Sequence, residues 1–78
     1  MKTNEELIKK LNNELGELND KLNRLNSYWM SQTAMEKSFR DCSQLQLDLL
    51  AAQSSSMRSY AYILRSRISD LLGEYNEN

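Results

Sequence analysis

The chain has 78 residues, a net charge of −1, one cysteine and no histidine. Its length allows one domain at most, and its charge provides no basic field for duplex nucleic acid. An intrachain disulfide is excluded and the residues argue against a structural zinc site, so oligomerisation is the expected means of stabilising so short a chain.

The sequence predicts an all-α fold, in a single domain over residues 1–78, because proline is absent and glycine occurs only at Gly16 and Gly73. The first helix is expected over about residues 4–27, with Thr3 as the N-cap of a capping box in residues 3–6. Gly16 lies within this helix, either as a tolerated residue or at a close approach of a neighbouring backbone. The apolar side chains follow a heptad pattern: Leu11, Leu15, Leu18, Leu22, Leu25 and Trp29.

A connection is expected over about residues 28–41, followed by a second helix over about residues 42–73. Possible capping boxes begin at Thr33 and at Asp41. The second helix could therefore begin near Ala34, or a short helical turn could precede it. Gly73 suits the position just after a helix.

The second helix also carries an apolar stripe. Its members are Leu47, Leu50, Ser54, Met57, Ala61, Leu64, Ile68, Leu71 and Tyr75. Two striped helices with a short connection predict an antiparallel hairpin. Because two helices alone cannot cover both stripes and a further half-apolar row, we expect the hairpins to assemble into a homo-oligomeric helical bundle.

That further row steps along the second helix by four and three residues: Leu49, Gln53, Ser56, Tyr60, Ile63 and Arg67. Within it, Gln53, Tyr60 and Arg67 are seven residues apart and project in nearly the same direction. The segment between Asp48 and Asp70 has no acidic residue but contains three arginines: Arg58, Arg65 and Arg67.

Arginine binds phosphate with two hydrogen bonds and tyrosine can stack on a base, so a site for a small anionic nucleotide between adjacent protomers is chemically plausible. The alternative, which the residue pattern alone favours, is a set of polar positions at the rim of a bundle. Tyr28 lies off the heptad pattern and could contact a ligand, although a role at the end of the hairpin is favoured. The candidate ligand-binding residues are Tyr28, Gln53, Ser56, Arg58, Tyr60 and Arg67.

Residues for catalysis are few. Histidine, the commonest general acid or base, is absent, and Cys42 has no activating base beside it. There is no glycine-rich phosphate loop. We therefore expect a protein that is not an enzyme and that needs no metal or cofactor.

The chain also lacks an apolar run of the ~18 residues that a membrane span needs, and residues 1–6 lack the apolar segment of a signal peptide. These features, with the single cysteine, predict a cytoplasmic protein without membrane partners.

The second helix and the residues just before it carry a spaced pattern: Phe39, Cys42, Gln46, Leu49, Leu50, Gln53, Met57, Tyr60, Ile63, Leu64, Arg67 and Ile68. This pattern resembles a family of small phage proteins that are usually labelled crAss-phage-related. A leucine helix rich in lysine and glutamate precedes this pattern in that family, as residues 4–25 do here. Size, hairpin shape and the Tyr/Arg row are also loosely similar to anti-CBASS and anti-Thoeris sponges, oligomers that bind cyclic nucleotide signals of bacterial immunity without cleaving them.

The resemblance implies that Tyr60 stacks on a base, Arg67 pairs with phosphate and Gln53 recognises a polar edge. It also implies a phage protein that acts in the cytoplasm of an infected bacterium. Two other functions fit the sequence. One is a helical module that binds a host protein, and the other is a purely structural coiled-coil oligomer.

Overall fold

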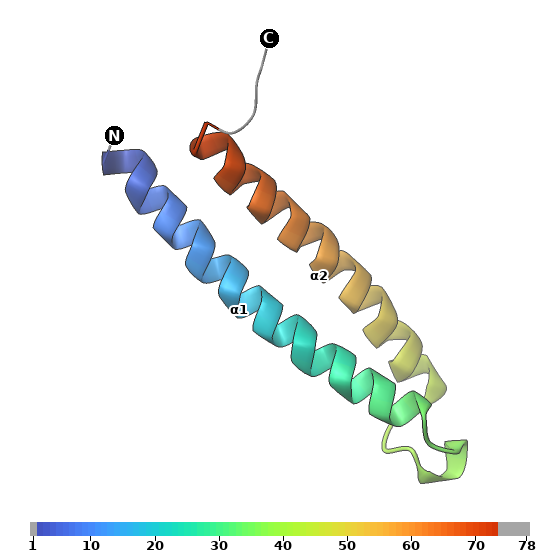
Figure 1. Ribbon diagram of the computed structural model, residues 1–78. Helices are drawn as coiled ribbons and strands as arrows, with labels where there is room; N and C mark the ends of the chain where they lie inside the picture. Colours follow the sequence, from blue (N-terminus) through green and yellow to red (C-terminus); the bar gives the residue numbers. More distant parts are fainter. Residues whose placement is uncertain (1, 74–78) are drawn as a thin grey trace.

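The computed structural model describes residues 2–73, which form two antiparallel helices joined at one end (Figure 1). Helix α1 spans Lys2–Thr33, a 3-10 turn η1 spans Lys37–Phe39, and helix α2 spans Gln44–Leu71. The hairpin is elongated, with extents of 56 × 25 × 15 Å. The predicted all-α hairpin is confirmed. Tyr75, which the sequence placed on the second stripe, lies outside the described residues.

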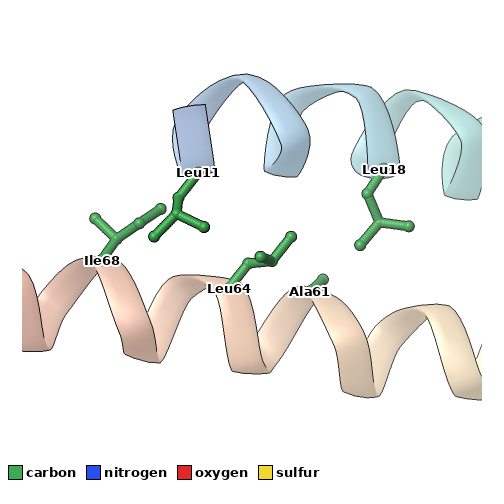
Figure 2. Packing of buried hydrophobic residues seen from close by; sticks show 5 residues of the cluster. All are labelled: Leu11, Leu18, Ala61, Leu64 and Ile68. Carbon is green, nitrogen blue, oxygen red and sulfur yellow. The ribbon is translucent and has the colours of Figure 1, made fainter. Parts of the chain in front are cut away.

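The apolar stripes of α1 and α2 face each other along the hairpin. Leu11 and Leu18 of α1 meet Ala61, Leu64 and Ile68 of α2, and Leu64 is 0% exposed (Figure 2). Half-buried residues surround this cluster: Leu7, Ile8, Leu15, Met57 and Leu71. Burial of apolar area therefore holds the helices together, as the heptad spacing predicts.

Helix α1 begins at Lys2 and continues to Thr33, so the predicted N-cap Thr3 and the predicted end near residue 27 are both wrong. Polar residues near the C-terminal end do not stop the helix, because their side chains bond within the hairpin. Asn26 accepts a hydrogen bond from the Oγ of Ser54 at 2.8 Å. The Oγ1 of Thr33 donates to the carbonyl of Trp29 at 2.9 Å, so Thr33 does not cap a second helix.

Arg40 and Gln32 organise the connection between the helices. The Arg40 guanidinium donates to the carbonyls of Gln32 (2.9 Å) and Thr33 (3.4 Å) at the C-terminal end of α1, and to that of Met35 (3.3 Å) in the connection. Gln32, only 2% exposed, accepts from the backbone N–H of Asp41 at 2.8 Å and donates to its carboxylate at 3.3 Å. These bonds set where α1 ends and how the chain turns.

The turn η1 is the short helical turn that the sequence allowed, so the alternative of one helix continuing from Ala34 is wrong. Ser43 is the N-cap of α2, and its hydroxyl accepts from the N–H of Gln46 at 3.1 Å. At the other end, Gly73 has a φ of 76° and follows the C-cap Leu72, as predicted. At Gly16, an added Cβ would meet nothing within 4 Å, so no backbone of the hairpin approaches it closely.

Candidate ligand-binding site

The polar row of α2 lies beside the buried stripe and is open to solvent. Gln53, Ser56, Tyr60 and Arg67 are all exposed. They share this surface with Leu49 and Ile63, each 52% exposed, and a further exposed leucine, Leu45, lies one turn earlier. The hairpin alone leaves this face open, and four of the six predicted ligand-binding residues lie on it.

Tyr60 connects the outer row to α1. Its hydroxyl donates a hydrogen bond to the Glu14 carboxylate at 2.5 Å, while the side chain remains 42% exposed. This hydrogen bond is the main reason why the pKa of Tyr60 is raised above its ordinary value of 10.0, with further contributions from burial and the Glu14 charge. The positive charge of Arg67 acts in the opposite direction and lowers that pKa, so Tyr60, Arg67 and Glu14 form one electrostatic cluster.

Glu14 is a functional candidate that the sequence reasoning missed. It is an exposed α1 residue beside the row of Leu11, Leu15 and Leu18, and nothing in its own spacing identifies α2 as its partner. Finding it would have required the register between α1 and α2, because Glu14 and Tyr60 are 46 positions apart in the chain. Its carboxylate adds negative charge beside the arginine that was predicted to bind phosphate.

Arg58 lies on a different side of α2. Successive residues of an α-helix turn by about 100°, so Gln53 and Arg58 fall on opposite sides of the buried Ser54 position. Arg58 has Ala51 and Arg65 as its heptad neighbours, whereas Gln53 has Tyr60. The predicted set is therefore divided between two sides of the hairpin seam.

A pocket of about 290 Å³ opens beside Arg58, between the two helices. It is lined by Asn26 and Trp29 of α1 and by Ala51, Ser54 and Arg58 of α2. The indole N–H of Trp29 donates to the carbonyl of Leu47 at 3.1 Å, and Ser54 is 5% exposed. The pocket combines an aromatic ring, a cation and the hydrogen-bonded pair of Ser54 and Asn26. Of the predicted residues, only Arg58 lines it.

Tyr28 lies apart from both groups, near the connection. The neighbouring side chain of Cys42 is the main cause of its raised pKa, followed by burial and then the charges of Cys42 and Asp41. The structure therefore places Tyr28 beside Cys42 of the connection and not with Tyr60, Arg67 or Arg58.

Within residues 2–73 no three His, Cys, Asp or Glu side chains gather where they could hold a metal ion. No helix in the described part of the chain is long and apolar enough to cross a membrane. The acid-free segment between Asp48 and Asp70 lies wholly on α2 and presents its three arginines to solvent. The chemistry available on this helix is the recognition of an anion and of planar rings.

The fold and these surfaces define a small antiparallel helical hairpin with side chains suited to binding and no metal cluster in its described part. The chain belongs to the Sequestin family, whose family model matches residues 5–70 and so includes both helices and the connection. No curated protein and no solved structure matches the chain.

Proposed function

We propose that this protein binds a cyclic nucleotide-type signalling molecule of bacterial anti-phage defence and sequesters it without cleaving it. Membership in a family named Sequestin supports the binding and retention of a molecule rather than its conversion. The observation that carries the proposal is the exposed row of Gln53, Tyr60 and Arg67 within an acid-free segment of α2. The resemblance to small phage proteins supports the setting, the cytoplasm of an infected bacterium.

In this proposal Tyr60 stacks its exposed ring on a base, as aromatic side chains do in many nucleotide sites. Arg67 pairs with a phosphate through its planar guanidinium, and Gln53 and Ser56 bond to polar edges of the ligand. The hydrogen bond from Tyr60 to Glu14 holds the ring in place before the ligand arrives. Fixing the ring in advance lowers the entropy cost of binding.

We propose that the binding unit is a homo-oligomer in which a second copy of the chain covers the outer face of α2. That face exposes three aliphatic side chains at helical spacing, Leu45, Leu49 and Ile63. Removing the apolar area of these side chains from water would favour association with a second copy. A second copy would cover these residues and enclose a ligand lying beside Tyr60 and Arg67.

Sequestration acts by mass action, so it requires tight binding and abundant protein. A signal at micromolar concentration demands a Kd in the nanomolar range, or about −12 kcal/mol. One aromatic ring and one arginine cannot supply this free energy alone. The requirement is a further argument for a site assembled from two copies.

The test is a thermal-shift panel of cyclic dinucleotides, cyclic trinucleotides and cyclic ADP-ribose isomers on protein of measured oligomeric state. A ligand present at 100 times its Kd should stabilise the protein by about 2.7 kcal/mol per site, which is several degrees for a small domain. Unchanged ligand recovered after incubation would establish retention without cleavage.

Arg67→Ala should remove the ligand-dependent shift in melting temperature, while sedimentation shows an unchanged oligomer. Arg65→Ala is the control for loss of a positive charge. If Arg67→Ala dissociates the oligomer, Arg67 has a structural role. A flat panel on folded protein would contradict sequestration of these signals. A helical module that binds a host protein would then be the better explanation of the exposed apolar residues.

A further inference from the structure

We propose that the pocket between Trp29 and Arg58 is a second ligand-binding site, which takes one planar base carrying a phosphate. The ligand class rests on the proposed function, whereas the position rests on the geometry of the pocket. The site is separate from the Tyr60 row because Arg58 and Gln53 lie on opposite sides of the buried Ser54 position.

The pocket exists because the apolar stripe of α2 is interrupted. Ser54 occupies a stripe position between the buried Leu47 and Ala61, where the heptad pattern calls for a large apolar side chain. Ala51 nearby is also small, and Asn26 lines the pocket from α1. Nearer the chain ends an apolar cluster fills the seam, whereas this segment leaves a volume of about 290 Å³.

The floor of the pocket is polar and still has a donor to offer. Ser54 donates its hydroxyl hydrogen to the Oδ1 of Asn26 at 2.8 Å, which fixes the orientation of the Asn26 amide. Among the described residues no buried side-chain nitrogen or oxygen lacks a partner, and the Nδ2 of Asn26 makes no hydrogen bond there. The Nδ2 of Asn26 is therefore not fully enclosed, and in this proposal it donates to a ring nitrogen or carbonyl of a base.

The aromatic wall is held in a fixed orientation. The indole N–H of Trp29 is bonded to the carbonyl of Leu47 at 3.1 Å, so the ring does not need to be ordered when a ligand binds. A base stacked on an aromatic side chain gains about 1–3 kcal/mol in single-stranded nucleic-acid sites. Trp29 offers this surface in the same pocket as the Asn26 amide.

Arg58 supplies the positive charge. It is exposed, and its helix neighbours three and four residues away are Ser54, Ser55, Ala61 and Tyr62, none of which is acidic. Its guanidinium is consequently available to a phosphate, in contrast to the Tyr60 side of the helix, where Glu14 adds a carboxylate. The planar guanidinium of Arg58 can donate two hydrogen bonds to the phosphate of a nucleotide.

The size of the pocket limits what it can take. Pockets that enclose a drug-sized ligand have about 300–1,000 Å³, so this one holds a single base with its phosphate at the mouth. A cyclic dinucleotide would place one unit in the pocket and leave the other outside it.

Trp29 is the only tryptophan of the chain, so its fluorescence reports directly on this pocket. We would titrate the protein with AMP, adenosine and inorganic phosphate, exciting the indole at wavelengths that adenine does not absorb. AMP should quench the emission in a saturable way, adenosine should bind more weakly, and phosphate alone should produce little quenching.

Arg58→Ala should lower the affinity for AMP about tenfold and leave the affinity for adenosine unchanged, because the variant removes only the partner of the phosphate. Arg65→Ala, one heptad along on the same side, is the matched control and should behave as the wild type. Circular dichroism would establish that each variant folds. An AMP affinity that falls equally in both variants, or an indole emission that no probe changes, would overturn the proposal.

The two proposals fail separately. A cyclic nucleotide could shift the melting temperature without quenching Trp29, and the shift could persist in Arg58→Ala. Sequestration would then stand, and the pocket would not be a binding site. If AMP quenches Trp29 in an Arg58-dependent way while the cyclic panel is flat, the pocket binds nucleotides and the proposed signal is wrong.

Discussion

The two halves of the α1–α2 interface are built differently. The half near the chain ends is apolar, with Leu11 and Leu18 packed on Ala61, Leu64 and Ile68. The half near the connection contains both buried polar residues of the described chain, Gln32 and Ser54, and the indole hydrogen bond of Trp29. Apolar contacts stabilise the fold whatever the exact orientation of the side chains, whereas hydrogen bonds require a defined distance and angle.

The contrast suggests a division of roles. Two leucine stripes could pair in registers that differ by a heptad, at similar cost. The bonds from Ser54 to Asn26, from Trp29 to Leu47 and around Gln32 are satisfied in only one register. The polar half therefore fixes the alignment, and its small residues leave the pocket. The apolar half supplies most of the stabilisation.

The largest effect should come from Leu64→Ala in the apolar half. Leu64 is fully buried, and truncation of such a leucine costs about 2–5 kcal/mol from lost burial and the cavity left behind. For a chain of this size that is a large share of its stability. Urea unfolding followed by circular dichroism would measure it. A loss below about 1 kcal/mol would mean that the apolar half does not dominate.

Gln32→Ala tests the polar half and should cost less, about 1–3 kcal/mol, because it leaves the N–H of Asp41 without its acceptor. Gln46→Ala, at an exposed position of α2, is the matched control for the same change of side chain. If Gln32→Ala cost as much as Leu64→Ala, the connection would contribute to stability as strongly as the core. The proposed division between the halves would then be wrong.

The sequence predicted the apolar half well, because heptad spacing depends only on positions within each helix. Both stripes, the hairpin and the end of α2 at Gly73 follow from such local patterns. The end of α1 could not be predicted in this way, because the side chain of Asn26 bonds to Ser54, a residue 28 positions away. Such a partner depends on the register between helices, which no local pattern contains.

The candidate sites divide in the same way. The exposure of Gln53, Tyr60 and Arg67 follows from their place on the helix, and the structure agrees with it. The sequence could not reveal that Glu14 reaches Tyr60 or that Asn26 and Trp29 share a pocket with Arg58. Each of these pairings joins α1 to α2. The ligand contacts proposed for all these residues stay predictions.

The smallest effect is expected from Tyr60→Phe, which removes the polar bond that crosses to α1 within the apolar half. The pKa of Tyr60 is raised, chiefly by its hydrogen bond to Glu14, so the protonated hydroxyl stabilises the folded state. This contribution is complete below the ordinary tyrosine pKa of 10.0 and is lost as the pH rises through the higher folded value.

The wild type should therefore melt slightly above Tyr60→Phe near neutral pH, and the two melting temperatures should converge above pH 10.0. Tyr62→Phe, at a more exposed tyrosine, is the control for removal of a hydroxyl. Because the Tyr60 side chain is open to solvent, the difference should be well below that of Gln32→Ala. A loss of stability as large as that of Gln32→Ala would show that a hydrogen bond also sets the helix register in the apolar half. Both halves of the hairpin would then fix the register.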